Sequence, residues 1–484
     1  MRKIYAYMIC LVLVIFLQKT ALANQDTLKK QVHDLQVLIK EMKNEFETRI
    51  NEMEHKIAKL ETKKPETKKE DIFTQSDKSD NSSLTTKESI APLLNRAAAN
   101  QFVSSDTGKW SPAQPITLWG TGKSYMNISF DGLFVAAGST ARDLEKLETG
   151  DHDPIQRGFT VPNEEMVFDG AVDPYFKGLA DIVYKINKKG ETSTELEEAY
   201  LTTFSLPLNL QLKAGTFFTE FGRLNPTHPH TWNFADQPLI NGRFFGPDGL
   251  RNPGVRLSWL APTDNYTELL FTIQDSQGET ATSFRNNDGL FGRKAVETRV
   301  RNMKDFLYVP RIKTTFELTD TQVLLLGASA AYGPNSTGTD KNTLIYGLDA
   351  FWKWKSEYAS YGFPFVTWQT EIMGRRFEAG EDVDANLSSD VMHNWGAYSE
   401  VTWGFKKGWV AGLRGDYIDG LKGATDPLGF ERLRLSSNLT FFPSEFSKFR
   451  LQYNYDDILG NDNTEHSVFL QFEFLLGSHG AHKF

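Results

Sequence analysis

Segments in which polar and apolar residues alternate recur from about residue 116 onward, and they constrain the fold more than any other feature. Near the C-terminus, the stretch HSVFLQFEFLL places on one face Val468, Leu470, Phe472, Phe474 and Leu476. In the stretch RLQYNYDD, apolar or aromatic residues alternate with polar ones in the same way. A period of two is typical of a β-strand with one apolar and one polar face. We therefore predict about sixteen antiparallel strands, the first at 128–137, the second at 166–172 and the last ending at residue 476.

The connections between these strands alternate in length. Long connections at 138–165, 223–254 and 275–305 are separated by short ones such as DPY, LPLN, PTDN and LTDT. A chain that crosses a slab repeatedly, with tight turns on one side and large loops on the other, is typical of a transmembrane β-barrel. Aromatic residues beside the short turns fit a belt at the membrane boundary: Trp259, Trp354, Trp403, Trp409 and Phe442.

The polar face of the predicted strands carries many charges. Burying so many ions in a dry core would cost too much free energy, whereas a water-filled lumen removes this cost. The sequence therefore predicts an all-β transmembrane barrel whose lumen is lined by Arg256, Arg311, Lys313, Glu371, Arg375, Glu400, Arg414, Asp416, Arg432, Arg434 and Arg450.

The connection at 223–253 is long, aromatic and rich in proline and glycine. A loop longer than about fifteen residues is usually functional. We predict that it lies on the extracellular side, folds into the lumen and narrows the pore. An alternative is a rigid loop that packs on the barrel rim or on a neighbouring subunit. The residues predicted to form the constriction are His228, His230, Trp232, Arg243, Phe244 and Phe245.

The region before the barrel predicts three further segments. Residues 1–23 have a basic start, an apolar run and a closing Ala-Leu-Ala, which is typical of a secretory signal peptide. Residues 24–64 carry a heptad seam from Leu28 to Leu60 and predict a coiled-coil helix, with a lone charged helix as the alternative. Residues 65–115 are polar and predict a flexible linker. The barrel then occupies 116–484, and the coiled coil favours a homotrimer with its helices in the periplasm.

Two sets of motifs resemble known proteins. The run ELEEAYLTTFSLPLNLQLKAGTFFTEFGRLNPTHPHTW resembles a hairpin of the phosphate-selective porin superfamily. More narrowly, FGRLNPTHPHTW, GPDGLRNPGVRLSWLAPT and FLLGSHGAHKF are similar to Gram-negative outer-membrane proteins often labelled TonB-dependent receptors, sometimes zinc-regulated. The resemblance spans most of 128–484 and implies an outer-membrane barrel of porin type.

Two functions follow as hypotheses. The first is a channel for diffusion of small hydrophilic or charged solutes. The second is an outer-membrane receptor or transporter for a metal such as zinc, or for a metal complex, with TonB dependence implied by the label. No segment of plug size precedes the barrel, which favours the channel.

Other classes of function find little support in the sequence. The formal net charge of −9 does not suggest a nucleic-acid partner, and no catalytic motif predicts an enzyme. Histidine pairs occur, but no single element supplies three or four converging zinc ligands, so we predict neither a metal site nor a cofactor. The predicted partners are outer-membrane lipid, small solutes and further copies of the chain.

Overall fold

The computed structural model describes residues 115–477, apart from 122–123, 149, 205, 297–298, 422–429 and 459–462. The predicted signal peptide and coiled coil, and all but the last residue of the predicted linker, lie outside the described residues. The strands are β1 (Ile116–Thr121), β2 (Ser124–Ser139), β3 (Gly158–Ala171), β4 (Phe176–Ile186), β5 (Thr192–Thr203), β6 (Leu210–Phe218), β7 (Arg251–Leu260), β8 (Thr267–Gln274), β9 (Leu307–Thr319), β10 (Gln322–Pro334), β11 (Asn342–Ser360), β12 (Phe363–Ala379), β13 (Asp390–Lys406), β14 (Trp409–Ile418), β15 (Arg432–Ser444), β16 (Ser447–Ile458) and β17 (Asn463–Leu476). The helical segments are η1 (Leu144–Leu147), η2 (Pro207–Asn209), η3 (Pro229–Thr231), α4 (Leu239–Phe245), η4 (Glu279–Ala281) and η5 (Met303–Asp305).

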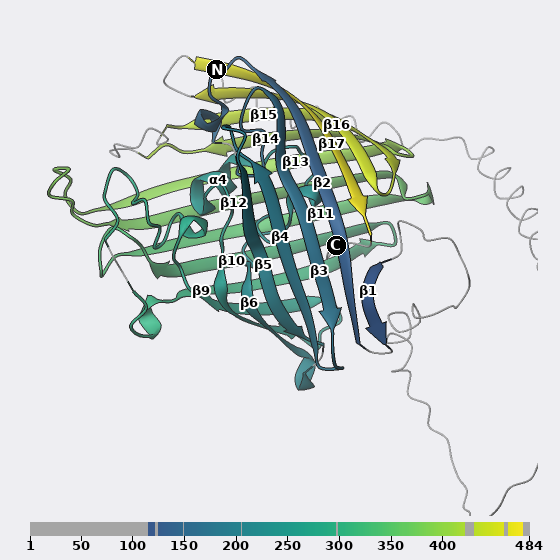
Figure 1. The fold of residues 1–484 in the computed structure, drawn as a ribbon, viewed down its shortest axis with the longest axis horizontal. Coiled ribbons are helices and arrows are strands. Elements are labelled where there is room, and N and C mark those ends of the chain that lie inside the picture. Colours follow the sequence, from purple (N-terminus) through teal and green to yellow (C-terminus); the bar gives the residue numbers. More distant parts are fainter. Residues whose placement is uncertain are drawn as a thin grey trace, which may run out of the picture. The chain divides into compact units, whose positions relative to one another are not determined.

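The strands form one closed antiparallel barrel (Figure 1). From β2 to β17 each strand pairs with the next, and β17 returns to pair with β2 through Leu470 and Ala136. That ring has sixteen strands, as the alternation predicts. The short strand β1 pairs with β2 through Ile116 and Ile128, just beyond the point where β17 leaves β2 at Phe130. It therefore extends the same edge and adds no strand to the ring.

Two strands differ from the sequence prediction. β1 has only six residues and is not among the predicted strands. β3 begins at Gly158, where the alternation predicts a start near 166. Its first half, GFTVPNEE, contains Pro162 and Asn163. The pairing with β2 also shifts register between Leu133 and Val135. A bulge of this kind interrupts the alternation of polar and apolar residues, so the sequence pattern does not predict the first half of this strand.

The two faces of the sheet differ sharply in chemistry. Alternate residues of β13 are buried and exposed along most of its length. The exposed face of the sheet carries large apolar side chains such as Leu413 (67% exposed) and Leu451 (52% exposed), whereas the buried face carries charged ones such as Arg434 (1% exposed). An apolar exterior around a charged interior reverses the arrangement of a water-soluble sheet protein. Among the described residues, no helix is long and apolar enough to cross a membrane.

The connections are short at one end of the barrel and long at the other. β9–β10 and β13–β14 are joined by two residues each, 320–321 and 407–408. At the opposite end, residues 140–157, 219–250 and 275–306 form the longest connections. Trp259 and Trp403 lie near the short turns with 38% and 53% of their surface exposed. This arrangement follows the predicted alternation of long and short connections.

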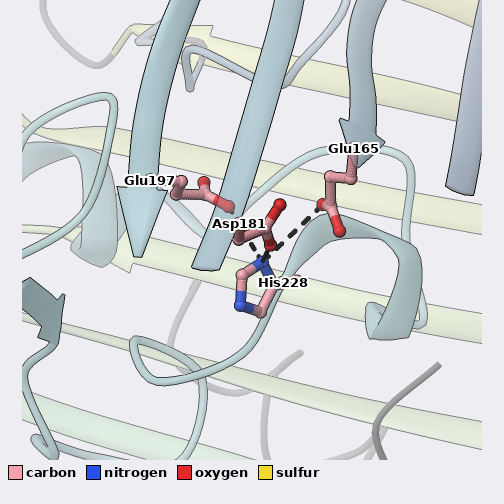
Figure 2. A group of neighbouring side chains, drawn as sticks. All are labelled: Glu165, Asp181, Glu197 and His228. Carbon is pink, nitrogen blue, oxygen red and sulfur yellow. Dashed lines mark ion pairs between the residues drawn. The ribbon is translucent and has the colours of Figure 1, made fainter. Parts of the chain in front are cut away.

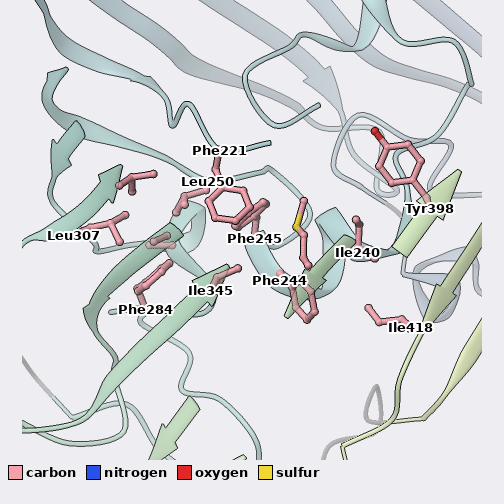
Figure 3. Packing of buried hydrophobic residues seen from close by; sticks show 14 residues of the cluster. Phe221, Ile240, Phe244, Phe245, Leu250, Phe284, Leu307, Ile345, Tyr398 and Ile418 are labelled. Atoms are coloured by element: carbon pink, nitrogen blue, oxygen red, sulfur yellow. The ribbon is translucent and has the colours of Figure 1, made fainter. Parts of the chain in front are cut away.

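Residues 219–250, called the inserted loop below, enter the barrel from the long-loop end. Figure 3 shows Phe221, Phe244 and Phe245 packed among side chains of the strands, including Ile345 and Ile418. The rings of Phe221 and Phe245 meet edge to face with centroids 5.1 Å apart. Among the described residues, the apolar cluster with the most members is thus built around this loop inside the barrel, and we call it the apolar core.

Candidate functional site

A cavity of about 1730 Å³ occupies the part of the barrel nearest the short turns. We call it the vestibule. Phe204, Tyr361 and Phe446 line it at the turns. At its other end the lining includes Leu224 and Trp232 of the inserted loop. The vestibule therefore opens toward the short turns, and the inserted loop forms its floor.

Basic side chains outnumber acidic ones on the vestibule lining. The nine basic residues are Lys177, Lys213, Arg223, Arg256, Arg311, Lys313, Lys353, Lys407 and Arg450. The five acidic residues are Asp181, Glu198, Glu220, Glu400 and Glu445. The local charge is therefore positive, although the whole chain is acidic.

Asp236 holds the inserted loop to the barrel interior. Its Oδ1 lies 2.9 Å from Arg414 Nη2, and its Oδ2 lies 3.1 Å from Arg434 Nη1. The side-chain amides of Gln452 and Asn454 donate further hydrogen bonds to the two oxygens at 2.6 and 2.7 Å. One buried carboxylate thus pairs with two guanidinium groups from different strands, and each guanidinium also pairs with a strand carboxylate, Asp416 for Arg414 and Asp456 for Arg434.

Other polar residues of the barrel bind the backbone of the inserted loop. Glu371 accepts hydrogen bonds from the backbone N–H groups of Arg223 and Leu224 at 3.1 and 2.9 Å. Asp416 accepts one from the N–H of Leu239 at 3.1 Å. Arg450 donates to the carbonyl of Trp232 at 2.8 Å. Strand side chains therefore satisfy loop backbone groups that water would otherwise have to satisfy.

The eleven residues predicted to line the pore fall into two groups. Five line the vestibule: Arg256, Arg311, Lys313, Glu400 and Arg450. Six lie outside the vestibule lining: Glu371, Arg375, Arg414, Asp416, Arg432 and Arg434. Most of the second group contact the inserted loop, while Arg432 donates to the carbonyl of Lys146 at 2.5 Å. Among described residues, the six are paired or hydrogen-bonded within the protein.

The residues predicted to form the constriction also separate. His228 and Trp232 line the vestibule. Arg243 is buried and donates from Nε to Glu148 Oε1 at 2.6 Å. Phe244 and Phe245 belong to the apolar core. His230 is buried beside the carboxylates described below.

The inserted loop also lines a second, much smaller pocket. Its volume is about 20 Å³, and it is lined by His152, Asp248 and others. It shares four lining residues with the vestibule: Phe218, Leu224, Thr227 and Trp232. A volume of this size holds about one water molecule.

A cluster of histidines and carboxylates lies where the inserted loop meets β3, β4 and β5. Figure 2 shows Glu165, Asp181 and Glu197 pointing toward His228 of the loop. His228 Nδ1 lies 2.9 Å from Glu197 Oε2, 3.5 Å from Asp181 Oδ2 and 3.7 Å from Glu165 Oε1. Its Nε2 lies 3.0 Å from Glu198 Oε2. We call these five residues the His228 cluster.

Two further histidines extend this cluster. His230 Nδ1 lies 3.2 Å from Asp131 and 3.1 Å from Glu165. His152 Nε2 lies 3.0 Å from Glu197. The same His152 nitrogen lies 3.3 Å from Asp248. Two further groups, Asp131 with Glu165 and His230, and His152 with Glu197 and Asp248, therefore each bring three nitrogen or oxygen atoms within 4.8 Å of one another.

A bulge in β5 explains why two consecutive glutamates reach this cluster. Asp181 pairs with Glu198, but the next residue, Ile182, pairs with Leu196, so Glu197 has no partner across the strand. Consecutive residues of a regular strand point to opposite faces, and a bulge removes that rule locally. As a result, Glu197 and Glu198 are both buried, 1% and 6% exposed.

The neighbouring carboxylates change the protonation of the loop histidines. Burial lowers the pKa of His228, but Glu197 and Glu165 outweigh burial and hold this pKa well above its ordinary value. Burial also opposes protonation of His230, yet Glu165 and Asp131 raise its pKa to about 10. In the absence of other cations, the inserted loop therefore carries imidazolium charges opposite the acidic barrel wall at neutral pH.

Sequence reasoning missed the acidic half of this site. Alternation in SFDGLF and ELEEAY gives a weak signal for Asp131 and for one glutamate of β5. The second glutamate points inward only because of the bulge, and the bulge leaves no recognisable pattern in the sequence. The histidine pair of the loop stands out in the sequence, but its carboxylate partners come from separate strands and so lie far away along the chain.

Comparisons with known proteins give one clear sequence relative. No family model matches the chain. An uncharacterized protein of Aquifex aeolicus (strain VF5) is 30% identical over 388 residues, which cover 74% of this chain and 79% of that protein.

Several solved structures are also similar to this chain. An anion-selective porin from Comamonas acidovorans has 7% identity and a TM-score of 0.46, over 73% of this chain and 100% of that chain. The outer membrane channel DcaP of Acinetobacter baumannii has 13% identity and a TM-score of 0.46, over 75% and 100%. In-vitro folded OmpT of Vibrio cholerae in its trimer form has 8% identity and a TM-score of 0.43, over 72% and 99%.

Proposed function

The chain belongs to the same family as the uncharacterized Aquifex aeolicus protein, and we propose that it is a porin-like channel of the Gram-negative outer membrane for small hydrophilic solutes. One observation carries the proposal. A closed sixteen-stranded ring presents apolar side chains outward and encloses a charged cavity of about 1730 Å³. Lipid around the barrel solvates the apolar outer face, and water inside it solvates the charged inner face. In this proposal the long loops face the outside and the predicted coiled coil lies in the periplasm.

The inserted loop is proposed to be the constriction. Two features support this role: the loop forms the floor of the vestibule, and its side chains pack and pair with the strands inside the barrel. A solute larger than water would then cross only when side chains around Leu224 and Trp232 move aside. We therefore expect a small conductance for the intact protein.

The vestibule is proposed to favour anions. Its nine basic and five acidic side chains support this preference. In a narrow aqueous path, charges on the wall act on a passing ion more strongly than charges farther away than the screening length of about 8 Å. The acidic loops therefore matter less than the lining residues.

Solute uptake into proteoliposomes tests the proposal. We expect small anions, such as acetate, to enter faster than cations of the same size, and entry to slow steeply as solute size increases. Empty liposomes and liposomes with heat-denatured protein serve as controls. Uptake no faster than in empty liposomes, with the folded protein inserted, would rule out the channel.

A further inference from the structure

The His228 cluster has the composition and spacing of a metal site. It offers one imidazole nitrogen and three carboxylate oxygens, and these atoms lie within 4.8 Å of one another. Ligands of a tetrahedral zinc-type ion sit about 2.0–2.1 Å from the metal and so roughly 3.3 Å from each other. The distances from His228 Nδ1 to the three oxygens, 2.9, 3.5 and 3.7 Å, bracket that separation.

The buried carboxylates of the cluster depend on histidine protons or lack a hydrogen bond. Glu197 is 1% exposed, and among the described residues its oxygens face the imidazole nitrogens of His152 and His228, which can donate to them only when those nitrogens carry a proton. Asp181 is 2% exposed, and its Oδ1 has no hydrogen-bond partner in this part of the chain. A buried polar atom without a hydrogen bond destabilises the fold, and more strongly when it is charged. A cation at the centre of the cluster would remove this destabilisation.

The balance of charge points to a cation of charge two. Five carboxylates face three imidazoles here: Asp131, Glu165, Asp181, Glu197 and Glu198 against His152, His228 and His230. Within the described residues, these histidines are the ion-pair partners of four of the carboxylates: Asp131, Asp181, Glu197 and Glu198. With all three histidines protonated, the carboxylates exceed them by two charges; when His228 gives up its Nδ1 proton to a metal ion the excess becomes three, and a cation of charge two offsets most of it.

Glu198 orients the histidine for binding. Its carboxylate lies 3.0 Å from His228 Nε2, so it holds the proton on that nitrogen and leaves the Nδ1 lone pair directed at the three carboxylates. Carboxylates that accept the second N–H of a metal-binding histidine are a regular feature of metal sites. The bulge in β5 is what brings Glu197 and Glu198 inward together.

We propose that Glu165, Asp181, Glu197 and His228 bind one divalent transition-metal ion of the zinc type, with Glu198 as the residue that positions His228. Mixed nitrogen and oxygen ligands at this spacing favour such an ion over Mg²⁺ or Ca²⁺, which take six or more oxygens. Because three ligands come from strands and one from the inserted loop, the ion would fasten the loop to the barrel wall.

Metal binding to the full-length protein in detergent tests the proposal. The protein is stripped with a chelator and titrated with Zn²⁺, Co²⁺, Mg²⁺ and Ca²⁺ by calorimetry, and bound metal is counted after gel filtration. We expect Zn²⁺ and Co²⁺ to bind, and His228→Gln and Asp181→Asn each to lose one equivalent per chain. Glu198→Gln should keep that equivalent with an affinity about 10–100-fold weaker.

The exposed His393→Gln and Asp384→Asn serve as matched controls that should bind as the parent does. Retention of heat-modifiable migration on gels shows that each variant is folded. Binding unchanged in both His228→Gln and Asp181→Asn, no Zn²⁺ bound by the folded parent, or equal affinity for Ca²⁺ and Zn²⁺ would overturn the proposal. No ion flux is measured, so the result is independent of whether the protein conducts.

Discussion

At the scale of single residues, Asp236 is the point where the inserted loop and the barrel depend on each other. Its carboxylate pairs with Arg414 and Arg434, each of which also pairs with a strand carboxylate, Asp416 or Asp456, and all of these side chains are buried. Asp236→Asn would leave both arginines with a charged partner, but it would remove the two buried ion pairs that hold the loop to the strands.

We therefore expect Asp236→Asn to loosen the inserted loop while the strands stay paired. Limited proteolysis should cut the variant within residues 219–250 under conditions that leave the parent intact, and its melting temperature should fall. The matched control is Asp384→Asn, whose ion pair with Lys294 is exposed and screened by water. Equal cutting of the two variants would contradict the role given to Asp236.

Two lysines of the vestibule can be changed to test its ion selectivity without altering the fold. Lys353 and Lys407 line the cavity and are exposed. Lys353→Glu combined with Lys407→Glu should move the reversal potential under a salt gradient toward cation preference, more strongly at low salt. Lys294→Glu, in a long loop, should leave it unchanged. If the control shifts the potential as much as the double variant, vestibule charge does not set selectivity.

The sequence pattern predicts which face of a strand a residue lies on, but it does not predict which group the side chain contacts there. A period of two assigns Arg414, Arg434 and Arg450 to the polar face. The partner of each arginine depends on the path of the inserted loop. The sequence of this loop has no periodic pattern from which its path could be predicted. The sequence therefore predicts a row of charges but not that Asp236 and the carbonyl of Trp232 bind them.

At the scale of elements, the inserted loop differs from the strands in how it is held. The strands are joined by backbone ladders, whereas the loop is held by side chains of the barrel and by the apolar core around Phe244 and Phe245. The loop can therefore be removed without removing any pairing between strands.

Replacing residues 226–250 with a short Gly-Ser linker should raise the single-channel conductance severalfold, because the vestibule would then connect directly to the long-loop end. The register of β6 with β7, from Leu210–Trp259 to Phe218–Arg251, should survive and can be checked by circular dichroism and heat-modifiable migration. A folded variant with the parent's conductance would give the loop a packing role only.

Elements with a regular pattern could be predicted, and irregular ones could not. Sixteen strands and the alternation of long and short connections follow from periodicity and turn residues. β1 is too short to show a period, and the first half of β3 is obscured by a bulge. The bulge in β5, which assembles the His228 cluster, is invisible for the same reason.

At the scale of the whole molecule, the predicted coiled coil at 24–64 lies outside the described residues, and assembly remains a prediction from the heptad seam. A seam from Leu28 to Leu60 needs partner helices to bury its apolar residues. Cross-linking should give trimers for the full-length protein, and less stable ones for a version lacking residues 24–64. Monomers alone in both would contradict the assembly.

We propose that this barrel conducts small ions through a narrow, positively charged path. Single-channel recording of the purified full-length protein in a planar bilayer under a salt gradient tests it most directly. We expect discrete, small conductance steps and a reversal potential on the anion side. An inserted, folded protein without steps would contradict the channel, and a reversal potential on the cation side would contradict the role of the vestibule charges.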